Sequence, residues 1–264
     1  MCKLLGIARS SLYFHTKHER KNRYNDEGIT EKIIDIFKAS RNNYGTRKIK
    51  VELYKSGYTV SRRRIGRIMK ENGLVSTYTV KQFKLGKSTC NNDNIENVLN
   101  RNFKQEKRMN VVVSDLTYVN VGGKWNYICL MIDLFNREIV GYAAGKNKDA
   151  ELVKKAMQNI KYDLSKINLF HTDRGNEFKN RKIEDILEGF NIKRSLSNKG
   201  CPYDNAVAEA TYKIIKTEFA YNRRFEDFRE LELSLFDYVN WYNRKRIHSA
   251  LGYRTPIEYR KLFS

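Results

Sequence analysis

Hydrophobic and polar positions follow two different periods along this chain. Up to residue 73 the apolar residues recur every three or four positions, which is typical of amphipathic helices. In residues 26–40 these apolar positions fall on one helical face: Ile29, Ile33, Ile36 and Phe37. Acidic residues stand in the first turn of this segment, where the helix dipole favours them. The pattern predicts a helix over this stretch.

Two further helices are predicted immediately downstream. The first contains Ile49 and Leu53 on its apolar side, and the break SGYTVS follows it. The second begins at Ser61, a residue type preferred as an N-cap, and ends at Gly73, which suits a helix C-terminus. Two helices joined by a short turn predict a helix-turn-helix.

From residue 110 the period changes to that of β-strands. Three β-rich runs come first, and helical and strand segments then alternate: NVVVSDLTYV, KWNYICLMIDL, EIVGYAAG, DAELVKKAMQNI, NLFHTD, RKIEDILEGF and IKRSL. Two long helical segments complete the chain: AVAEATYKIIKTEF and FEDFRELELSLFDYVNWYN. This order predicts an α/β fold with a mixed five-stranded sheet and flanking helices. We expect an all-α region at 1–75, a polar linker at 76–104 and the α/β domain at 105–264.

The charge of the chain indicates its partner. Lys and Arg number 51 against 30 Asp and Glu, giving a net charge of +21 and a pI near 9.7. Such a surface repels itself unless a polyanion neutralises it, so nucleic acid is the expected partner. Four arginines lie in the first two turns of the third helix, where a recognition helix meets phosphates and guanine edges: Arg62, Arg63, Arg64 and Arg67. A solvated basic face is the alternative interpretation.

Other classes of protein are disfavoured. The longest apolar run, residues 127–132, is far shorter than the roughly 20 residues of a membrane span, and no secretory signal is evident. Four cysteines without a CxxC pair suggest neither a disulfide framework nor a structural zinc site. The pair His15 and His18 lacks cysteine partners, and we interpret it as solvent-facing. We expect an intracellular protein.

Three acidic residues stand where they could meet. Asp115 lies in the first strand between Val113 and Thr117, and Asp173 ends a later strand. If these strands are neighbours, the two carboxylates face each other at one end of the sheet, where only a cation would relieve their repulsion. Taken alone, Asp173 in HTDRGNEF is more typical of a simple turn after a strand.

The third acid, Glu209, lies on a predicted helix. At 100° per residue it shares a face with Lys213 and Lys216, whereas Ala208 and Tyr212 belong to the apolar face. An ordinary ion pair between Glu209 and Lys213 is the simple interpretation. Three acids from two strands and a helix, in so basic a chain, match instead the two-metal arrangement of phosphodiester chemistry. The expected cofactor is Mg²⁺, two ions, with Mn²⁺ as a substitute, because Mg²⁺ prefers oxygen ligands.

These motifs resemble a known family. VVVSDLTYV, HTDRGNEF, PYDNAVAEATYKIIK and WYNRKRIHSALGYRTPIEY are similar to segments of the DDE transposases related to retroviral integrases. Specifically, they resemble the second-frame (OrfB) transposases of insertion-sequence family three. Between Asp173 and Glu209 lie 35 residues (174–208), the D-35-E interval of this group, and Lys216 follows Glu209 by seven. Residues 44–75 resemble the family's helix-turn-helix, so the similarity covers residues 44 to 260.

The resemblance implies a fold, an activity and roles for individual residues. It implies an RNase H-like integrase catalytic domain in which Asp115, Asp173 and Glu209 bind the metals and Lys216 contacts DNA near the cleaved end. The implied activity is metal-dependent cleavage and strand transfer at the ends of an insertion element. The implied partners are double-stranded DNA, further copies of the chain and an upstream-frame (OrfA-like) product, which is often fused by frameshifting. The implied location is the bacterial cytoplasm, on nucleoid DNA.

Several other residues receive structural interpretations. We expect Asp133 to end a strand, Asp204 to cap a helix and His171 to be held by hydrogen bonds. Trp241, Tyr242 and Tyr253 are expected to pack, and a basic group beside them could line the path of the DNA: Arg244, Lys245, Arg246 and His248. The segment CKLLGIARSSLYF near the start reads as the second half of another helix-turn-helix. No consequence is assigned to Asn136 and Arg137.

Two alternative functions fit part of the pattern. A DNA-binding regulator or inactive element remnant explains the charge without any chemistry. An RNase H-type nuclease acting on RNA–DNA hybrids fits the sheet and the acids, although the helix-turn-helix argues against it. Cleavage and joining assays with duplex and hybrid substrates separate the three.

Overall fold

A computed structural model gives the fold of this chain. It describes residues 26–79, 96–198, 204, 206–221 and 223–263, with isolated positions in the first 25. The predicted second helix-turn-helix near the start, the His15 and His18 pair and the middle of the linker lie outside the described residues. So do three of the four cysteines; the fourth, Cys129, is a buried free thiol.

The helix-turn-helix prediction is confirmed. Three helices form a bundle: α2 (Glu27–Ala39), α3 (Thr46–Lys55) and α4 (Arg62–Glu71). The side chain of Ser61 accepts a hydrogen bond of 3.2 Å from the Arg64 amide, as expected of an N-cap. Gly73 has a φ of +64°, the left-handed conformation that glycine adopts freely after a helix. The core is formed by buried apolar residues of all three helices.

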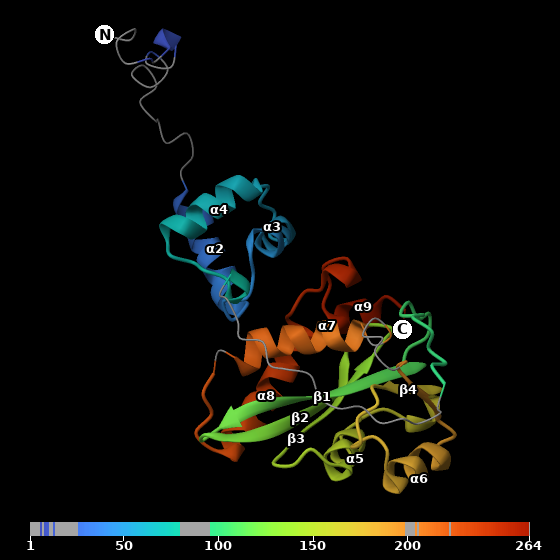
Figure 1. Cartoon of the computed structure of the whole chain (residues 1–264). Helices are drawn as coiled ribbons and strands as arrows, with labels where there is room; N and C mark the ends of the chain where they lie inside the picture. The colour runs from blue at the N-terminus through green and yellow to red at the C-terminus, as the bar shows by residue number, and fades with distance from the viewer. Residues whose placement is uncertain are drawn as a thin grey trace.

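The predicted five-stranded mixed sheet is also confirmed. Its strands are β1 (Val111–Val121), β2 (Lys124–Asp133), β3 (Ile139–Gly145), β4 (Leu169–Thr172) and β5 (Lys193–Leu196). They lie in the order β3-β2-β1-β4-β5, with β1–β2 and β2–β3 antiparallel and β1–β4 and β4–β5 parallel. This is the RNase H-like arrangement, in which the longest strand lies at the centre (Figure 1).

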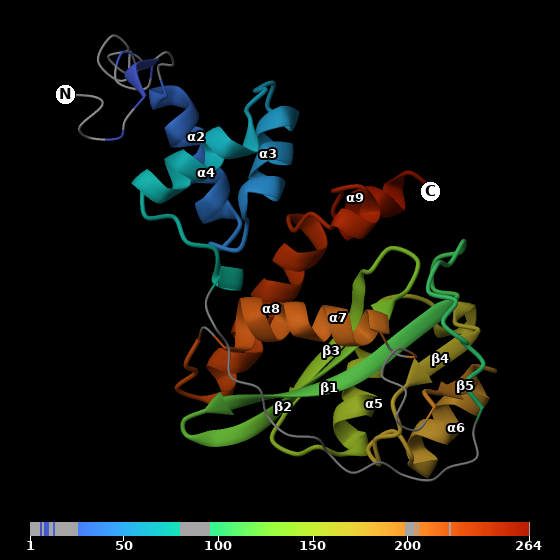
Figure 2. The ribbon, with the colours of Figure 1, turned by 45° about the horizontal axis from the view of Figure 1, so that its top comes forward.

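Helices cover both faces of the sheet. On one face lie α5 (Ala150–Gln158) and α6 (Arg181–Gly189), and on the other α7 (Ala206–Ile215) and α8 (Phe228–Arg244) (Figure 2). A short helix, α9 (Pro256–Lys261), contacts α8. Because side chains alternate along a strand, Val113 of β1 packs on the α7 side and Val112 on the α5 side. Asp115 has the same parity as Val113, so it faces α7.

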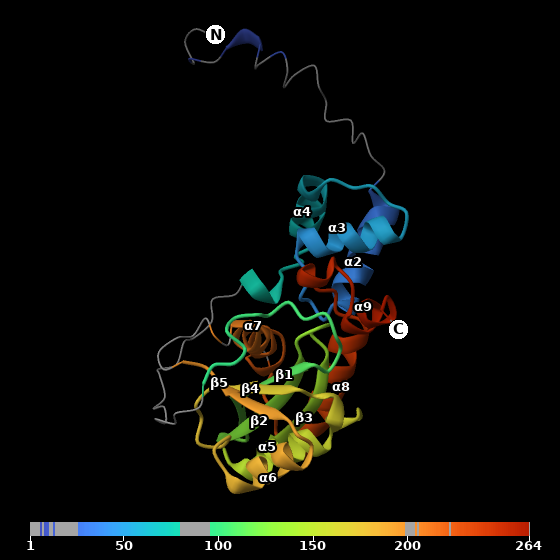
Figure 3. The same cartoon turned by 90° about the vertical axis from the view of Figure 1, so that its right-hand side faces the viewer.

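The helical module docks on the C-terminal part of the chain, as the side view shows (Figure 3). Ile247 joins the apolar core of the module, and its amide donates to the Tyr44 hydroxyl at 2.8 Å. The guanidinium of Arg41 lies 5.1 Å from the ring of Trp241, whose indole N–H donates to the Ala39 carbonyl. Trp241 therefore packs, as predicted, and it packs at the junction of the two modules.

A buried ion pair completes this junction. Helix α7 continues into a π-helical segment, Lys216–Ala220, closed by a 2.8 Å bond from the Tyr221 amide to the Lys216 carbonyl. In this segment Glu218 is 7% exposed and lies 2.7 Å from Arg246, which is 3% exposed. Tyr78, just after the helical module, and Tyr238 of α8 donate hydrogen bonds to the same carboxylate. Arg246 is therefore part of the fold, because its guanidinium is paired with the buried Glu218 carboxylate; that it lines the path of the DNA stays a prediction.

Asp133 and His171 have the structural roles that were predicted, whereas Asp204, predicted to cap a helix, binds other groups. Asp133 accepts hydrogen bonds from two backbone amides at the end of β2. His171 lies between two serine hydroxyls, at 2.8 and 3.2 Å. Asp204 is buried and binds the Arg101 guanidinium at 2.7 Å and the Asn198 amide at 3.1 Å. In the described part of the chain, no helix is long and apolar enough to cross a membrane.

Replacing Glu218 with Gln tests the buried ion pair. The substitution leaves the Arg246 charge buried without its counter-ion, so we expect the free energy of unfolding to fall by roughly 3–5 kcal/mol. Urea unfolding followed by circular dichroism measures this. The matched control is Glu52→Gln, because Glu52 forms an exposed pair with Lys55 at 3.0 Å and such pairs contribute only about 0–1 kcal/mol. Equal losses in the two variants would contradict the prediction.

Candidate active site

The strand register brings two of the predicted acids together. Ser114 of β1 pairs with Thr172 of β4 in parallel, and the next residues along the two strands are Asp115 and Asp173. Neighbouring residues of parallel strands point to the same face, so both carboxylates lie on the side covered by α7. Both residues are half-buried. The condition set by the sequence, that these strands must be neighbours, is met.

Burial and proximity shape the protonation of this pair. Burial raises the pKa of Asp115 to about 7, and the adjacent Asp173 carboxylate adds to the rise. Burial also raises the pKa of Asp173. Each carboxylate accepts one backbone hydrogen bond, from the Leu116 amide at 2.7 Å and the Gly175 amide at 3.0 Å. Two amides are too few to neutralise a carboxylate pair, which leaves oxygen lone pairs available to a cation.

Tyr212 fixes the position of α7 over the acids. Its side chain is 2% exposed, and its hydroxyl lies between β1 and β2, where it donates to the Asp115 carbonyl. The same hydroxyl accepts a 2.8 Å hydrogen bond from the Leu130 amide. Because Asp115 and Leu130 are ladder partners, the phenol takes part in the backbone bonding of the strand that carries the acid.

Helix α7 presents the third acid and two lysines to this end of the sheet. Glu209 and Lys213 are exposed, and Lys216 is half-buried with its ammonium 5.4 Å from the Tyr118 ring. Burial and the Asp173 charge raise the pKa of Glu209, whereas the Lys216 charge lowers it. Lys216 also lowers the pKa of Asp115. The three acids and Lys216 therefore act on one another electrostatically.

A fourth carboxylate beside Asp173 was missed by the sequence analysis. Glu177 is 6% exposed and forms an ion pair of 3.1 Å with Lys148, which follows β3. Burial raises the pKa of Glu177, and its charge raises that of Asp115. Lys148 lies 29 positions upstream, so no local spacing reveals the pair. An acid four residues after a predicted strand-end Asp was the only available signal.

The donor set fits a hard divalent cation in its chemistry. Adjacent carboxylates with raised pKa values are stabilised by a cation, and carboxylate oxygens are the ligands that Mg²⁺ prefers. Among the described residues, however, no three His, Cys, Asp or Glu side chains stand close enough to enclose a metal. Asp115 and Asp173 form the adjacent pair, and Glu209 is exposed on α7.

The four arginines of α4 fall into two groups. Arg62 and Arg63 are exposed at the start of the helix. Arg64 binds the Asp26 carboxylate through its Nε at 2.8 Å, and Arg67 binds Asp26 as well as Glu71 at 3.1 Å. These pairs lower the pKa of Asp26 and tie α4 to the start of α2. Arg64 and Arg67 thus stabilise the module itself.

Comparisons with known proteins place the chain in a class. Two models of the integrase core domain match residues 105–202 and 209–262, and a model of an HTH-like domain matches residues 23–82. The transposase for insertion sequence element IS904 from Lactococcus lactis is 30% identical, across 91% of this chain and 96% of its own length. A 31 kDa protein of insertion element IS600 from Shigella sonnei is 33% identical, across 100% of this chain and 98% of its own.

The chain belongs to the insertion-sequence transposases with an integrase core, and it is a DDE-type polynucleotidyl transferase with an HTH-like DNA-binding region. Within this class it falls in insertion-sequence family three. The InsF transposase of insertion sequence IS3A from Escherichia coli K12 is 26% identical, across 98% of this chain and 92% of its own. The recognition made from the motifs is confirmed. Integrase-type cores are metal-dependent.

Solved structures similar to this chain include viral integrase cores. The catalytic core domain of HTLV-2 integrase in complex with magnesium is 16% identical, covers 58% of this chain and 96% of its own, and has a TM-score of 0.45. The catalytic core of BIV integrase is 18% identical, covers 59% and 96%, and has a TM-score of 0.45.

Replacing Tyr212 with Phe tests the contact between α7 and β1. Loss of the hydroxyl leaves the buried Leu130 amide without that acceptor, so we expect the free energy of unfolding to fall by about 1–3 kcal/mol. Urea unfolding measures the loss, and Tyr221→Phe is the control, because Tyr221 is 41% exposed and follows the same helix. Equal free energies of unfolding for the two variants would contradict the prediction that the Tyr212 hydroxyl stabilises the contact between α7 and β1.

Proposed function

We propose that this chain cuts DNA at the ends of its insertion element and joins the freed 3′-OH to target DNA, using Asp115, Asp173 and Glu209 as metal ligands. The register of β1 and β4 carries the proposal, since it sets Asp115 beside Asp173 on the face covered by α7. The same helix carries Glu209. The family supplies the reaction class, and these residues supply a site for it.

The three acids and two nearby lysines each have a distinct role in this proposal. Asp115 and Asp173 provide the fixed pair of carboxylates, and Glu209 closes the site from α7. Lys216 lies near enough to lower the pKa of two of these acids, and we assign it the phosphate next to the cleaved bond. Lys213 is exposed one turn away and contacts the DNA backbone. The three carboxylates would hold two Mg²⁺ ions, or Mn²⁺ in their place, and the bound metal would supply positive charge to the attacking oxygen and to the leaving 3′ oxygen.

The domain division and DNA contacts follow from the same arrangement. In this proposal residues 1–75 form the DNA-binding region, residues 76–104 form the linker, and residues 105–264 form the catalytic domain. On α4 we assign DNA contact to Arg62 and Arg63, because Arg64 and Arg67 hold Asp26. Joining two element ends to one target requires more than one active site, so we infer a homo-oligomer on DNA, with an upstream-frame product as a further partner. Because its substrate is DNA, we infer that the protein acts in the bacterial cytoplasm.

Replacing Glu209 with Gln tests the assignment of the acids. The amide keeps the shape and removes the charge, and metal-assisted stabilisation is worth several kcal/mol, so we expect strand transfer to fall by at least roughly 100-fold. Oligonucleotides from the DNA flanking the gene are scored for 3′-end cleavage and joining, with Mg²⁺ and with a chelator. Both the chain alone and its fusion to an upstream frame are tested.

Glu188→Gln is the matched control, because Glu188 is exposed on α6, on the opposite face of the sheet. Its activity should equal that of the unchanged protein. Undiminished strand transfer by Glu209→Gln would falsify the role of Glu209. DNA binding without products, even for the fusion with Mg²⁺, would point to a regulator or remnant.

A further inference from the structure

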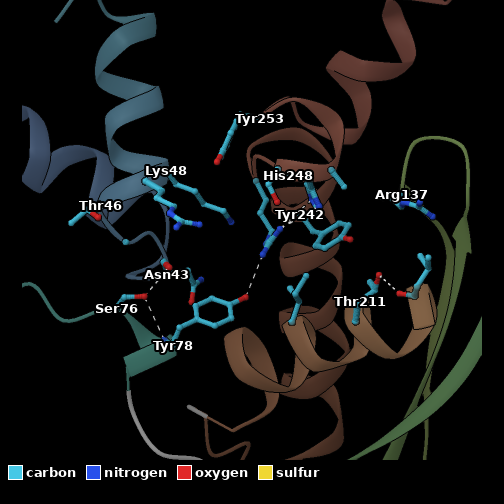
Figure 4. A pocket seen from close by; sticks show the side chains of 18 of the residues that line it. Asn43, Thr46, Lys48, Ser76, Tyr78, Arg137, Thr211, Tyr242, His248 and Tyr253 are labelled. Atoms are coloured by element: carbon cyan, nitrogen blue, oxygen red, sulfur yellow. Dashed lines mark hydrogen bonds between the residues drawn. The ribbon is translucent and has the colours of Figure 1, made fainter. Parts of the chain in front are cut away.

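A large cavity lies between the helical module and α7. Its volume is about 890 Å³, enough for a nucleotide, and Figure 4 shows its two walls. One wall is formed by the start of α3 and the segment that follows α4, and the other by α7 and the chain after α8. The lining side chains of α7 lie on a third face of this helix, distinct from the face that packs on the sheet and from the face that carries Glu209. They are Ala206, Val207, Ala210, Thr211 and Ile214.

The lining of the cavity is basic. Five of its side chains are Lys or Arg and, among the described residues, none is Asp or Glu: Arg47, Lys48, Arg62, Arg137 and Arg246. Glu218 neutralises Arg246, whereas the guanidinium groups of Arg47, Arg62 and Arg137 keep their charge. Burial lowers the pKa of Lys48 to about 7, with the Arg246 charge adding to the effect and Glu218 opposing it. A bound anion would favour the charged form of this amine.

Two buried nitrogen donors in the lining have no partner within the described structure, and the Tyr242 hydroxyl is a third unpaired group. Asn43 is 2% exposed; its Oδ1 accepts from the Thr77 hydroxyl at 2.6 Å, and its Nδ2 donates to nothing. Arg137 donates from Nη2 to the Phe103 carbonyl at 3.0 Å, whereas its Nη1 is unpaired. A buried donor without an acceptor is costly, so the Asn43 amide, next to the start of α3, indicates an acceptor that the ligand brings.

The N-terminus of α3 opens on the same cavity. Gly45, the N-cap, offers no side-chain acceptor, and Gly45, Thr46 and Lys48 all line the space. The first amides of a helix have no intrahelical acceptor, and the helix dipole favours an anion there. Asn43 lies two residues before this N-cap, and its unpaired amide provides independent evidence for a missing acceptor. The site therefore combines a helix N-terminus, two free donors and several cations.

We propose that this cavity is a second DNA contact, in which a backbone phosphate binds at the start of α3 and the adjoining nucleoside lies against α7. The proposal rests on the proposed function, because it takes the phosphate to be that of the DNA substrate. Tyr78 and Tyr253 line the cavity and supply aromatic surface for a base or sugar. One bound strand would then touch the helical module and the helix of Glu209 together.

Replacing Asn43 with Asp is the principal test. Aspartate keeps the acceptor for Thr77 and the size of the side chain, but it puts a negative charge where the phosphate binds. We expect the affinity for a fluorescein-labelled duplex from the flanking DNA to fall by about tenfold or more, as for loss of a charge-assisted phosphate contact. Fluorescence anisotropy at several salt concentrations measures this.

Two further variants distinguish the effect of a negative charge inside the cavity from the effect of the same charge outside it. Asn42→Asp makes the same charge change one residue away at an exposed position outside the lining, and its affinity should stay within about twofold of the unchanged protein. Ala210→Glu adds a charge from the α7 wall at an exposed residue, so it preserves packing and should weaken DNA binding like Asn43→Asp. Equal losses in Asn42→Asp and Asn43→Asp, or an unchanged Ala210→Glu, overturn the proposal.

Nuclear magnetic resonance of the Asn43 side-chain amide identifies the source of the phosphate. The signal is assigned by its absence in Asn43→Asp, and the unchanged protein is titrated with the duplex, with a deoxynucleoside monophosphate and with inorganic phosphate. A shift with the duplex supports the proposal. A shift with the small phosphates and none with the duplex overturns it in favour of a free phosphate ligand. The cleavage assay with Glu209→Gln is independent, so the two proposals fail separately.

Discussion

Helix α7 has to satisfy three environments within ten residues, and the rest of the structure is arranged around that constraint. Its apolar face, with Ala208 and Tyr212, packs on the sheet. A second face carries Glu209 toward the acids of β1 and β4, and a third lines the cavity beside the helical module. At 100° per residue these faces are about 120° apart, so a small rotation of α7 would misplace all of them. The Tyr212 hydroxyl, bonded into the strand ladder, fixes that rotation.

The π-helical turn after α7 explains how the helix serves the active site and the junction together. Lys216 and Glu218 are two residues apart, yet Lys216 lowers the pKa of Asp115 and Glu209, whereas Glu218 is buried against Arg246. The wider turn adds a residue to the helix, which redirects the side chains that follow. Arg246, Tyr78 and Tyr238 then hold Glu218 from three different segments. The DNA-binding module and the helix of Glu209 are thereby joined through one buried carboxylate.

Much of this was predictable from the sequence, because it depends on local patterns. The period of three to four residues, the Ser61 cap and Gly73 specify the helices of the module. Alternation along β1 and the position of Asp173 at a strand end allow the acids to meet. The features that could not be predicted from the sequence depend on contacts between segments that are distant along the chain. The pairs of Glu177 with Lys148 and of Glu218 with Arg246 look like ordinary surface charges in the sequence, yet the fold buries both carboxylates.

Arg137 and Arg246 show why a basic residue in such a chain cannot be assigned to DNA from its charge alone. Arg246 stands in the basic segment WYNRKRIHSALGY, yet its guanidinium is bound by a buried carboxylate. Arg137 stands in a strand connection with a φ of +61° and keeps one nitrogen free in a basic cavity. What separates the two is the ion pair that Arg246 forms with Glu218. Burial and pairing therefore determine which cations stabilise the fold, and in this cavity the unpaired Asn43 amide is the group to which we assign the phosphate.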